Sequence, residues 1–245
     1  DAANLTLQAK RERDGFRLTG TKIWISNAPE TDVYSVSAPT ANSGSKGITA
    51  FVVPRESDGL SGEHLALLAP HPIGRLEFDG VRVEADHVLG EIGEGFGVAM
   101  DTLDLFRPSV GAFAVGMAQA ALDSAVGYTQ EREAFGKPLA SFQAVSHQLA
   151  DVATEIQAAR LLVREAATQY DAGVRPVRKA SAMAKLFCSD TAMAVTTEAV
   201  QILGGYGYIK EYPVERMMRD AKITQIYEGT NQVQRVVMAR QLLRG

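Results

Sequence analysis

A glutamate followed by glycine and threonine stands directly before the last predicted helix, in the segment Ile226-Tyr-Glu-Gly-Thr-Asn-Gln-Val-Gln-Arg235. The start of a helix offers free backbone N–H groups to an anion, and a carboxylate in an apolar pocket has a raised pKa that suits a general base. A structural interpretation fits equally, with Thr230 as the helix cap and Glu228 as a solvated turn residue. The spacing alone does not choose between the two.

Three glycines follow a helical run in the segment Gln201-Ile-Leu-Gly-Gly-Tyr-Gly-Tyr208. Because glycine has no side chain, Gly204 and Gly205 would let a ligand approach the backbone closely. Alternatively, Gly204 would end the helix as its C-cap and the other glycines would form the turn. Both interpretations stay open at this level.

Two further segments combine binding chemistry with an ordinary structural alternative. Arg132, in Arg132-Glu-Ala-Phe-Gly-Lys-Pro138, can fork onto a phosphate, although an arginine in the last turn of a helix also suits the helix dipole. Trp24 is the only tryptophan and lies in Lys22-Ile-Trp-Ile-Ser-Asn27, where an aromatic residue is usually part of the core or of the sheet surface. The common phosphate-loop, dinucleotide, nucleophile-elbow and zinc-protease motifs do not occur in the sequence.

The second half of the chain has the periodicity of long helices, which would position three of these segments. Nine apolar or aromatic residues between Phe142 and Tyr170 recur at alternating spacings of three and four, which places them on one stripe of a helix. Further helices are predicted at about Phe96 to Arg132 with a kink at Pro108, Lys179 to Leu203, and Val233 to Leu243. Four long helices with short connections predict an up-and-down four-helix bundle over residues 91–245.

Residues 1–90 have the pattern of a β-domain. Short segments rich in β-branched and aromatic residues alternate with the turn dipeptides Asp14-Gly15, Asp58-Gly59 and Asp79-Gly80. Because no helical pattern lies between them, an antiparallel sheet or a small barrel is expected, and the whole chain is predicted to have an α+β fold. The predicted strands are Phe16 to Leu18, Lys22 to Ser26, Val33 to Ser37, Ile48 to Val53 and Leu76 to Val83.

The composition favours a folded protein without a nucleic-acid or membrane partner. The 245 residues are 46% hydrophobic and carry a net charge of −4, which argues against disorder and against a basic nucleic-acid footprint. The longest uncharged run, Pro108 to Leu122, is shorter than the roughly 20 residues of a membrane-spanning helix. Cys188 is the only cysteine, so an intrachain disulfide is excluded, and no metal site is expected. No signal-peptide pattern is visible, and a cytoplasmic location is expected, or the mitochondrial matrix in a eukaryote.

Taken together, in this order and at these intervals, the segments resemble the acyl-CoA dehydrogenase family. The resemblance rests on Trp-Ile-Ser-Asn at 24–27, Leu-Asp-Leu-Phe-Arg-Pro at 103–108, Arg-Glu-Ala-Phe-Gly at 132–136, Gln-Ile-Leu-Gly-Gly at 201–205 and Tyr-Glu-Gly-Thr-Asn-Gln at 227–232. It covers essentially the whole chain and implies a central β-domain and a C-terminal four-helix bundle, usually assembled as a dimer of dimers. The family's N-terminal helical domain is not matched, and Asp1 resembles the last residue of a motif of the Thr-Glu-Pro-Gly-Ala-Gly-Ser-Asp type.

The resemblance implies a division of chemistry between Glu228 and FAD. Glu228 would remove the α-proton of an acyl-CoA thioester while the β-hydrogen leaves as a hydride to flavin N5. In the family, the thioester carbonyl is bound by the backbone N–H of this glutamate and by a flavin hydroxyl, an arrangement of the oxyanion-hole type. Tyr227 would shape the pocket beside the base, and Asp104 and Arg107 match positions that contact acyl-CoA.

The resemblance also implies which residues bind FAD, some of them across a subunit interface. Trp24, Ile25 and Ser26 would lie against the isoalloxazine ring, while Thr230 and Gln232 would contact the cofactor within their own subunit. Phe135 and Gly229 also match cofactor-binding positions. The residues that would reach the FAD of a neighbouring subunit are Arg132, Gln143, Gln201, Gly204 and Gly205.

Three positions depart from the family pattern. Phe106 stands where the isovaleryl and long-chain branches place their base, and because a phenyl ring cannot accept a proton, the role stays with Glu228. Phe106 would also narrow the acyl tunnel, which favours short or branched substrates. Phe142 replaces the histidine of some relatives, and Ala28 stands where glycine is common.

The leading hypothesis is therefore an FAD-dependent acyl-CoA dehydrogenase that passes electrons to an electron-transferring flavoprotein and assembles as a homodimer or homotetramer. A flavin oxidase or monooxygenase of the same fold is the second hypothesis, and rapid reaction of the reduced flavin with oxygen would distinguish it. A third is a non-catalytic partner chain that completes a related enzyme. The presence of both Glu228 and the flavin-contact residues counts against this third hypothesis, because such a chain need not keep the base.

Overall fold

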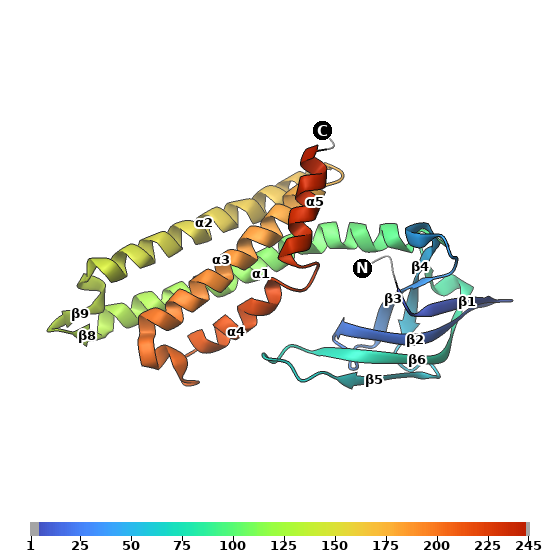
Figure 1. Ribbon diagram of the computed structural model, residues 1–245, viewed down its shortest axis with the longest axis horizontal. Coiled ribbons are helices and arrows are strands. Elements are labelled where there is room, and N and C mark those ends of the chain that lie inside the picture. Colours follow the sequence, from blue (N-terminus) through green and yellow to red (C-terminus); the bar gives the residue numbers. More distant parts are fainter. Residues whose placement is uncertain (1–4, 244–245) are drawn as a thin grey trace. The chain divides into compact units, whose positions relative to one another are not determined.

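The computed structural model describes residues 5–243, and the chain divides into two compact units, one up to Thr102 and one from Leu103 onward (Figure 1). Each unit has its own cluster of buried hydrophobic side chains, which is the property that defines a domain. The limit between the units lies inside the first α-helix, α1 (Gly95–Glu131). The sequence predicts domains at residues 1–90 and 91–245, and these limits stay a prediction.

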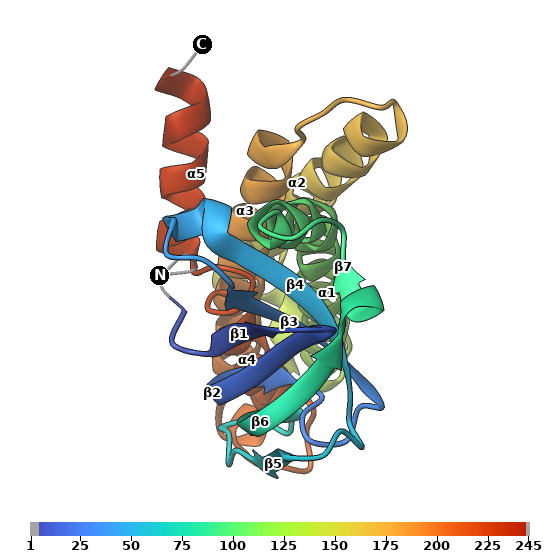
Figure 2. The same cartoon turned by 90° about the vertical axis from the view of Figure 1, so that its right-hand side faces the viewer.

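The first unit contains two antiparallel sheets, and the predicted α+β fold is confirmed. Its strands are β1 (Gln8–Glu12), β2 (Gly15–Ser26), β3 (Val33–Pro39), β4 (Ile48–Pro54), β5 (Leu60–His64), β6 (Ile73–Glu84) and β7 (Val88–Leu89). One sheet has the order β1-β2-β6-β5, which Figure 2 shows, and the other has the order β3-β4-β7. The buried rings of Phe16 in β2 and Phe51 in β4 pack edge to face, with centroids 5.0 Å apart, so the two sheets share one core.

Two predictions for this unit are wrong in detail. The predicted strands Phe16–Leu18 and Lys22–Ser26 form one strand, β2, because bulges absorb the irregular pattern instead of ending it. Asp79-Gly80 was expected to be a turn but lies inside β6, where Gly80 has a φ of 66°. Strands β1, β5 and β7 were not predicted: β1 and β5 are polar edge strands, and β7 has two residues.

The second unit is helical apart from a small hairpin. Its remaining helices are α2 (Gln143–Asp171), α3 (Arg178–Leu203), α4 (Val214–Thr224) and α5 (Asn231–Leu243). The hairpin β8 (Glu133–Ala134) and β9 (Lys137–Pro138) joins α1 to α2, and short 3₁₀ turns include η3 (Leu139–Ser141) and η4 (Gly204–Tyr208). The predicted stripe between Phe142 and Tyr170 matches α2 closely, and its Val152, Ile156 and Ala159 are buried in the core.

A four-helix core is present, but its fourth helix is not the predicted one. The buried cluster of this unit contains side chains of α1, α2, α3 and α4, with Val214 and Ala221 contributed by α4. The sequence prediction missed α4, although Val214, Met217 and Ala221 recur at helical spacing, because the helix has only 11 residues and glycines and a proline precede it. Helix α5, predicted as the fourth member, packs against α3 and contributes no side chain to this cluster within the described residues.

Helix α1 is long and rich in apolar residues. It continues through Pro108, and by length and composition it is the one helix in residues 5–243 that could cross a membrane. Its Ala114, Ala118 and Ala121 are fully buried in the core cluster, so its apolar residues have a packing role within the unit. Cys188 of α3 is also fully buried there and its thiol donates to the Ala159 oxygen at 3.2 Å, as expected for a packed cysteine.

Candidate active site

Glu228 lies in a strained turn between α4 and α5. Its φ is 57° and that of Gly229 is 85°, a backbone region that costs a non-glycine residue on the order of 1 kcal/mol or more. The Glu228 carbonyl accepts hydrogen bonds from Arg107 Nε at 3.1 Å and Gln234 Nε2 at 3.2 Å. The Gly229 carbonyl accepts from Lys185 Nζ at 3.0 Å and from Gln234 Nε2 at 2.9 Å. Three donors from α1, α3 and α5 therefore hold the strained conformation.

The donors that hold this turn are buried. Lys185 and Gln234 are 0% exposed and Arg107 is 4% exposed, so water does not compete for these donor groups. The turn is consequently anchored to the interior of the helical unit through its backbone. The Glu228 side chain is not used for this anchoring.

Glu228 is half-buried, and one of its carboxyl oxygens is left without a hydrogen bond within residues 5–243. Its Oε2 atom is buried and has no hydrogen-bond partner in the described part of the chain. Burial raises the pKa of Glu228 above its usual value, and this outweighs the opposing positive charges of Arg107 and Lys185. An unpartnered carboxylate with a raised pKa is the form of glutamate that accepts a proton most readily near neutral pH.

Two neighbouring groups complete the chemistry of the turn. The backbone N–H of Glu228 donates no hydrogen bond to the residues described, so it is free to bind a carbonyl oxygen. Burial and the charge of Glu228 raise the pKa of Tyr227 to about 12, so the phenol stays neutral beside the base. A proton acceptor and a carbonyl-binding donor are thus present on one residue.

The structural interpretation of Thr230 is confirmed. Its Oγ1 accepts from the N–H of Val233 at 3.3 Å and its carbonyl accepts from the N–H of Gln234 at 3.0 Å, which makes it the N-cap of α5. Gln232, in the first turn of α5, is exposed. Capping does not exclude a cofactor contact, and the FAD-binding role of both residues stays a prediction.

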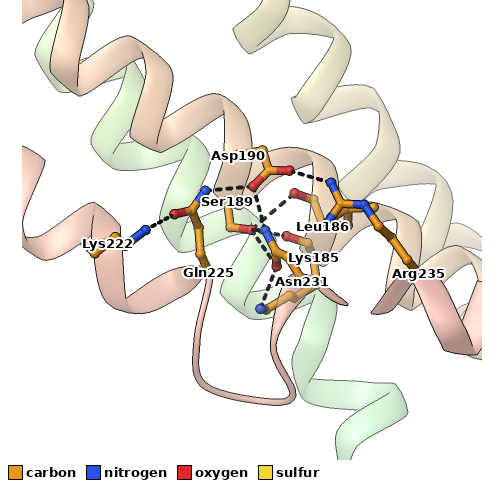
Figure 3. A network of polar contacts seen from close by, with 8 residues as sticks. All are labelled: Lys185, Leu186, Ser189, Asp190, Lys222, Gln225, Asn231 and Arg235. Atoms are coloured by element: carbon orange, nitrogen blue, oxygen red, sulfur yellow. Dashed lines mark hydrogen bonds and ion pairs between the residues drawn. The ribbon is translucent and has the colours of Figure 1, made fainter. Parts of the chain in front are cut away.

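A polar network fixes the start of α5 on α3 (Figure 3). Asn231 Oδ1 accepts from Lys185 Nζ at 2.8 Å, and Asn231 Nδ2 donates to Asp190 Oδ1 at 2.7 Å. Asp190 also accepts from Gln225 Nε2 at 2.7 Å and from Arg235 at 3.3 Å. Because this network joins α3 to both ends of the α4–α5 connection, it holds the segment that carries Glu228 from both sides.

Asp104 and Arg107 are both buried in this region, and each contacts protein groups. Asp104 Oδ2 accepts from Arg178 Nε at 2.9 Å, and its Oδ1 lies 3.7 Å from an Arg107 nitrogen. Their expected contact with substrate stays a prediction, but the structure gives Arg107 a second task as a donor to the Glu228 turn.

A second group of predicted residues lies at the end of the bundle where α1 and α3 finish. The Arg132 guanidinium stacks over the Tyr206 ring at 5.5 Å, and the rings of Phe135 and Phe142 lie 6.2 Å apart. These contacts bring the hairpin close to both the glycine-rich turn and the start of α2. All six side chains or glycines of this group are exposed, namely Arg132, Phe135, Gln143, Gln201, Gly204 and Gly205.

This bundle end has glycines and an aromatic that the internal packing does not explain. Gly204 ends α3 with a φ of 60°, so the predicted C-cap is confirmed. Gly205 has no positive φ, and a Cβ placed on it would meet only open space, so neither conformation nor internal packing requires glycine there. Phe135 is 96% exposed at a hairpin tip with a φ of 55°. Such features fit a surface that is covered by a ligand or another chain.

The first unit has a comparable feature at Trp24. It lies at a bulge of β2 with a φ of 66° and is 65% exposed, so it belongs to the sheet surface and not to the core. Ile25 is half-buried and Ser26 is exposed beside it. A bulky aromatic held in a strained, exposed conformation is a flat apolar surface for a planar ring.

Two domain families match the chain: the middle domain of acyl-CoA dehydrogenase at residues 1–81 and the C-terminal domain at residues 93–243. The chain belongs to the acyl-CoA dehydrogenase family. Members of this family are flavoproteins and are typically homotetramers.

Relatives of this family match the chain over its whole length. A probable acyl-CoA dehydrogenase of Mycobacterium tuberculosis is 48% identical over 100% of this chain and 64% of the relative. The structure of butyryl-CoA dehydrogenase from Megasphaera elsdenii matches with a TM-score of 0.97 and 46% identity, over 100% of this chain and 65% of that one. A structure of the electron transferring flavoprotein of Acidaminococcus fermentans contains a chain with the same score and identity, matched over 99% of this chain and 65% of that one. The chain therefore spans less than two thirds of the length of these relatives.

The observed features of this acyl-CoA dehydrogenase chain fit FAD, the cofactor that the family implies. The open glycine positions Gly204 and Gly205 would admit a phosphate-bearing chain close to the backbone, and Arg132 could pair with its charge. The exposed ring of Trp24 suits a flat heterocycle. The donor chemistry and the shape of these surfaces therefore agree with a flavin nucleotide.

Sequence reasoning missed Lys185, Asn231 and Gln234, which hold the Glu228 turn. A signal for Lys185 was present, because it falls on the same helical stripe of α3 as Ser181, Cys188 and Ala192, all of them buried. A lysine on the buried stripe of a helix needs acceptors from another element. No comparable sequence signal marked Gln234, whose burial depends on how α5 packs.

Proposed function

We propose that this chain is the middle and C-terminal part of an FAD-dependent acyl-CoA dehydrogenase that converts an acyl-CoA thioester to the trans-2-enoyl-CoA. The single observation that carries the proposal is the Glu228 turn. It combines a half-buried, unpartnered carboxylate of raised pKa with a free backbone N–H on the same residue. The family to which the chain belongs supplies the class of substrate.

In the proposed reaction, Glu228 removes the α-proton of the thioester. An α-proton is acidic enough only while its carbonyl oxygen is polarised, and the backbone N–H of Glu228 is a donor for that oxygen. Arg107, Lys185 and Gln234 hold the Glu228 and Gly229 carbonyls, which restricts the backbone that carries the carboxylate during proton transfer. FAD, when bound, supplies the acceptor for the β-hydrogen as a hydride. Tyr227 stays neutral and takes no proton from the substrate.

The residues proposed to hold FAD fall into two sets. Trp24, Ile25 and Ser26 would face the ring, and Gly229, Thr230 and Gln232 would contact the cofactor from the Glu228 segment. The exposed set at the bundle end would contact the FAD of a neighbouring subunit, which makes assembly part of cofactor binding. Arg132 and Phe135 carry that argument because the chain itself leaves them exposed.

The proposed substrate is a short acyl-CoA and the proposed electron acceptor is an electron-transferring flavoprotein. Phe106, in α1, is 51% exposed and has no proton-accepting group, and its bulk would shorten the space for an acyl chain. The similarity to a butyryl-CoA dehydrogenase supports a short chain, and the similarity to a chain in an electron-transferring flavoprotein structure supports the acceptor.

The test is an absorbance titration of the purified, flavin-loaded protein with acyl-CoAs of increasing chain length under anaerobic conditions. We expect the flavin absorbance to bleach fastest with short acyl-CoAs. A flavin spectrum that no acyl-CoA changes would contradict dehydrogenase chemistry and favour a non-catalytic partner chain. Admitting oxygen after reduction adds a second result, since rapid reoxidation with hydrogen peroxide release would assign an oxidase.

A further inference from the structure

Lys185 is a fully buried cation that holds the Glu228 turn but transfers no proton in the proposed reaction. It is 0% exposed, and its ammonium donates to two neutral oxygens, the Gly229 carbonyl at 3.0 Å and Asn231 Oδ1 at 2.8 Å. Charged lysines are rarely buried unless they are paired, because removing an ammonium from water costs several kcal/mol. In the described part of the chain, no ion pair compensates for this cost. A different benefit is therefore needed to explain why a lysine occupies the site.

The contacts of Lys185 act on the orientation of Glu228. The C=O and N–H groups of a trans peptide unit point in opposite directions, so anchoring a carbonyl fixes the whole plane. Lys185 anchors the peptide after Gly229, and Gln234 anchors both this peptide and the one before it. Asn231, which Ser189 and Asp190 hold in turn, fixes the position of the ammonium (Figure 3). These bonds together hold the two peptide units that follow Glu228, whose own φ is 57°.

The charge of Lys185 also acts on the carboxylate. Burial lowers the pKa of Lys185 to about 8, with Arg107 adding to the effect and Asp190 and Glu228 opposing it, so the ammonium is mostly charged at neutral pH. In return, Lys185 and Arg107 both lower the pKa of Glu228 against the effect of burial.

The other groups around Lys185 come from every element that packs there. Helix α1 provides Arg107, α3 itself provides Asp190, and the turn provides Glu228 with the neutral Tyr227. Helix α5 provides the neutral Asn231 and Gln234, and its Arg235 pairs with Asp190.

We propose that Lys185 is a positioning residue for Glu228: its buried ammonium holds the Glu228–Gly229 turn through the Gly229 oxygen and brings a positive charge to the segment that carries the carboxylate. The proposal rests on the proposed role of Glu228 as the base. Arg107 touches the Glu228 carbonyl from α1, whereas Lys185 touches the following carbonyl from α3, so the two cations hold successive peptide units.

The test is an infrared pH titration of the carboxyl band of Glu228 in the flavin-loaded protein, with the band assigned by its loss in Glu228→Gln. Lys185→Met keeps the length of the side chain and removes the charge, Lys185→Arg keeps the charge, and Lys179→Met is a matched control at an exposed lysine of the same helix. We expect Lys185→Met to move the midpoint to higher pH, Lys185→Arg to restore it, and Lys179→Met to leave it unchanged. If Lys185→Met does not fold, Lys185→Gln, which keeps a donor without the charge, must show the same upward movement.

Kinetics give the second readout. We expect Lys185→Met to lower kcat on the order of 10²-fold with little change in KM, and to move the rising limb of the pH–rate profile upward with the infrared midpoint. A wild-type midpoint and a wild-type pH profile in folded Lys185→Met would overturn the proposal. A wild-type protein that shows no acyl-CoA-dependent reaction would instead contradict the proposed function, while the infrared titration would still test the link between Lys185 and Glu228.

Discussion

Two regions of the helical unit use strained backbone in opposite ways. At the α4–α5 turn, Glu228 has a φ of 57° and its backbone is held by buried donors from α1, α3 and α5. At the bundle end, Phe135 has a φ of 55° and is 96% exposed. The two regions are separated along α3 by roughly 28 Å, the distance from Lys185 to Gly204.

This difference teaches which parts of the proposed site are complete within one chain. The backbone at Glu228 is held by buried donors from within this chain. The bundle end contains the arginine and the glycines that we propose bind the phosphate end of FAD, and the chain leaves them exposed. The strained backbone at Phe135 is explained if a ligand or another subunit contacts this region and stabilises it.

We expect the largest effect from a change at the α4–α5 turn. Glu228→Gln removes the proton acceptor while keeping shape, and we expect acyl-CoA-dependent flavin bleaching to fall by on the order of 10²- to 10⁴-fold. FAD content should stay at the wild-type level because the bundle end is untouched. Glu155→Gln, at an exposed position of α2, is the matched control and should react as the wild type. Unchanged bleaching in Glu228→Gln would remove the assignment of the base.

We expect the next largest effect from a change at the bundle end. Arg132→Ala removes one charge-assisted contact to a phosphate, which corresponds to about 1.5–3 kcal/mol, so FAD should bind about ten- to a hundredfold more weakly. The measurement is flavin release during dialysis, followed by fluorescence. Arg164→Ala removes the same charge from an exposed position of α2 and should retain flavin. Full flavin stoichiometry in Arg132→Ala under dilution would contradict the phosphate role.

A third change separates binding from stability at the bundle end. Phe135→Gly relieves a strained φ and removes an exposed ring, so the flavin-free protein should be as stable as the wild type or up to about 1 kcal/mol more stable. Flavin retention and assembly should nevertheless weaken. For contrast, Phe16→Ala in the β-domain core should lose about 3–5 kcal/mol in denaturant unfolding. A loss of similar size in Phe135→Gly would show that the contact with Phe142 stabilises the chain without any partner.

The smallest expected effect concerns stability at the Glu228 turn. Because the folded-state pKa of Glu228 is raised, the stabilisation from this group is present below the unfolded value of 4.5 and is lost as pH rises through the folded pKa. Glu228→Gln cannot ionise, so its thermal midpoint should exceed the wild-type midpoint at pH 8. The difference should shrink towards pH 4. A wild-type protein that is the more stable of the two at pH 8 would show that Arg107 and Lys185 outweigh burial.

Some of the helices follow from the sequence pattern alone, and others do not. The stripe from Phe142 to Tyr170 predicts α2 almost to the residue, because a long amphipathic helix has a period that nothing interrupts. Helix α4 has helical spacing in Val214, Met217 and Ala221, but it was missed because this pattern extends over only 11 residues. A local pattern therefore identifies a long helix with a continuous apolar stripe more readily than a short one.

In the candidate site, the sequence motifs identified Glu228 but not the buried residues that hold its turn. Lys185 is charged, and lysines are mostly exposed, so only its place on the buried stripe of α3 could have marked it. The contacts to Gly229 and Asn231 depend on how α5 returns to α3, more than 40 residues later in the chain. The strain at Glu228 likewise follows from these tertiary contacts, so no local propensity predicts it.

The central claim is that Glu228 removes the α-proton of an acyl-CoA. It is tested most directly by mass spectrometry of butyryl-CoA recovered after anaerobic incubation with the flavin-loaded protein in D₂O. The wild type should exchange an α-hydrogen for deuterium, and Glu228→Gln, matched for bound flavin, should exchange none above the rate without protein. Exchange by Glu228→Gln at the wild-type rate would contradict the account.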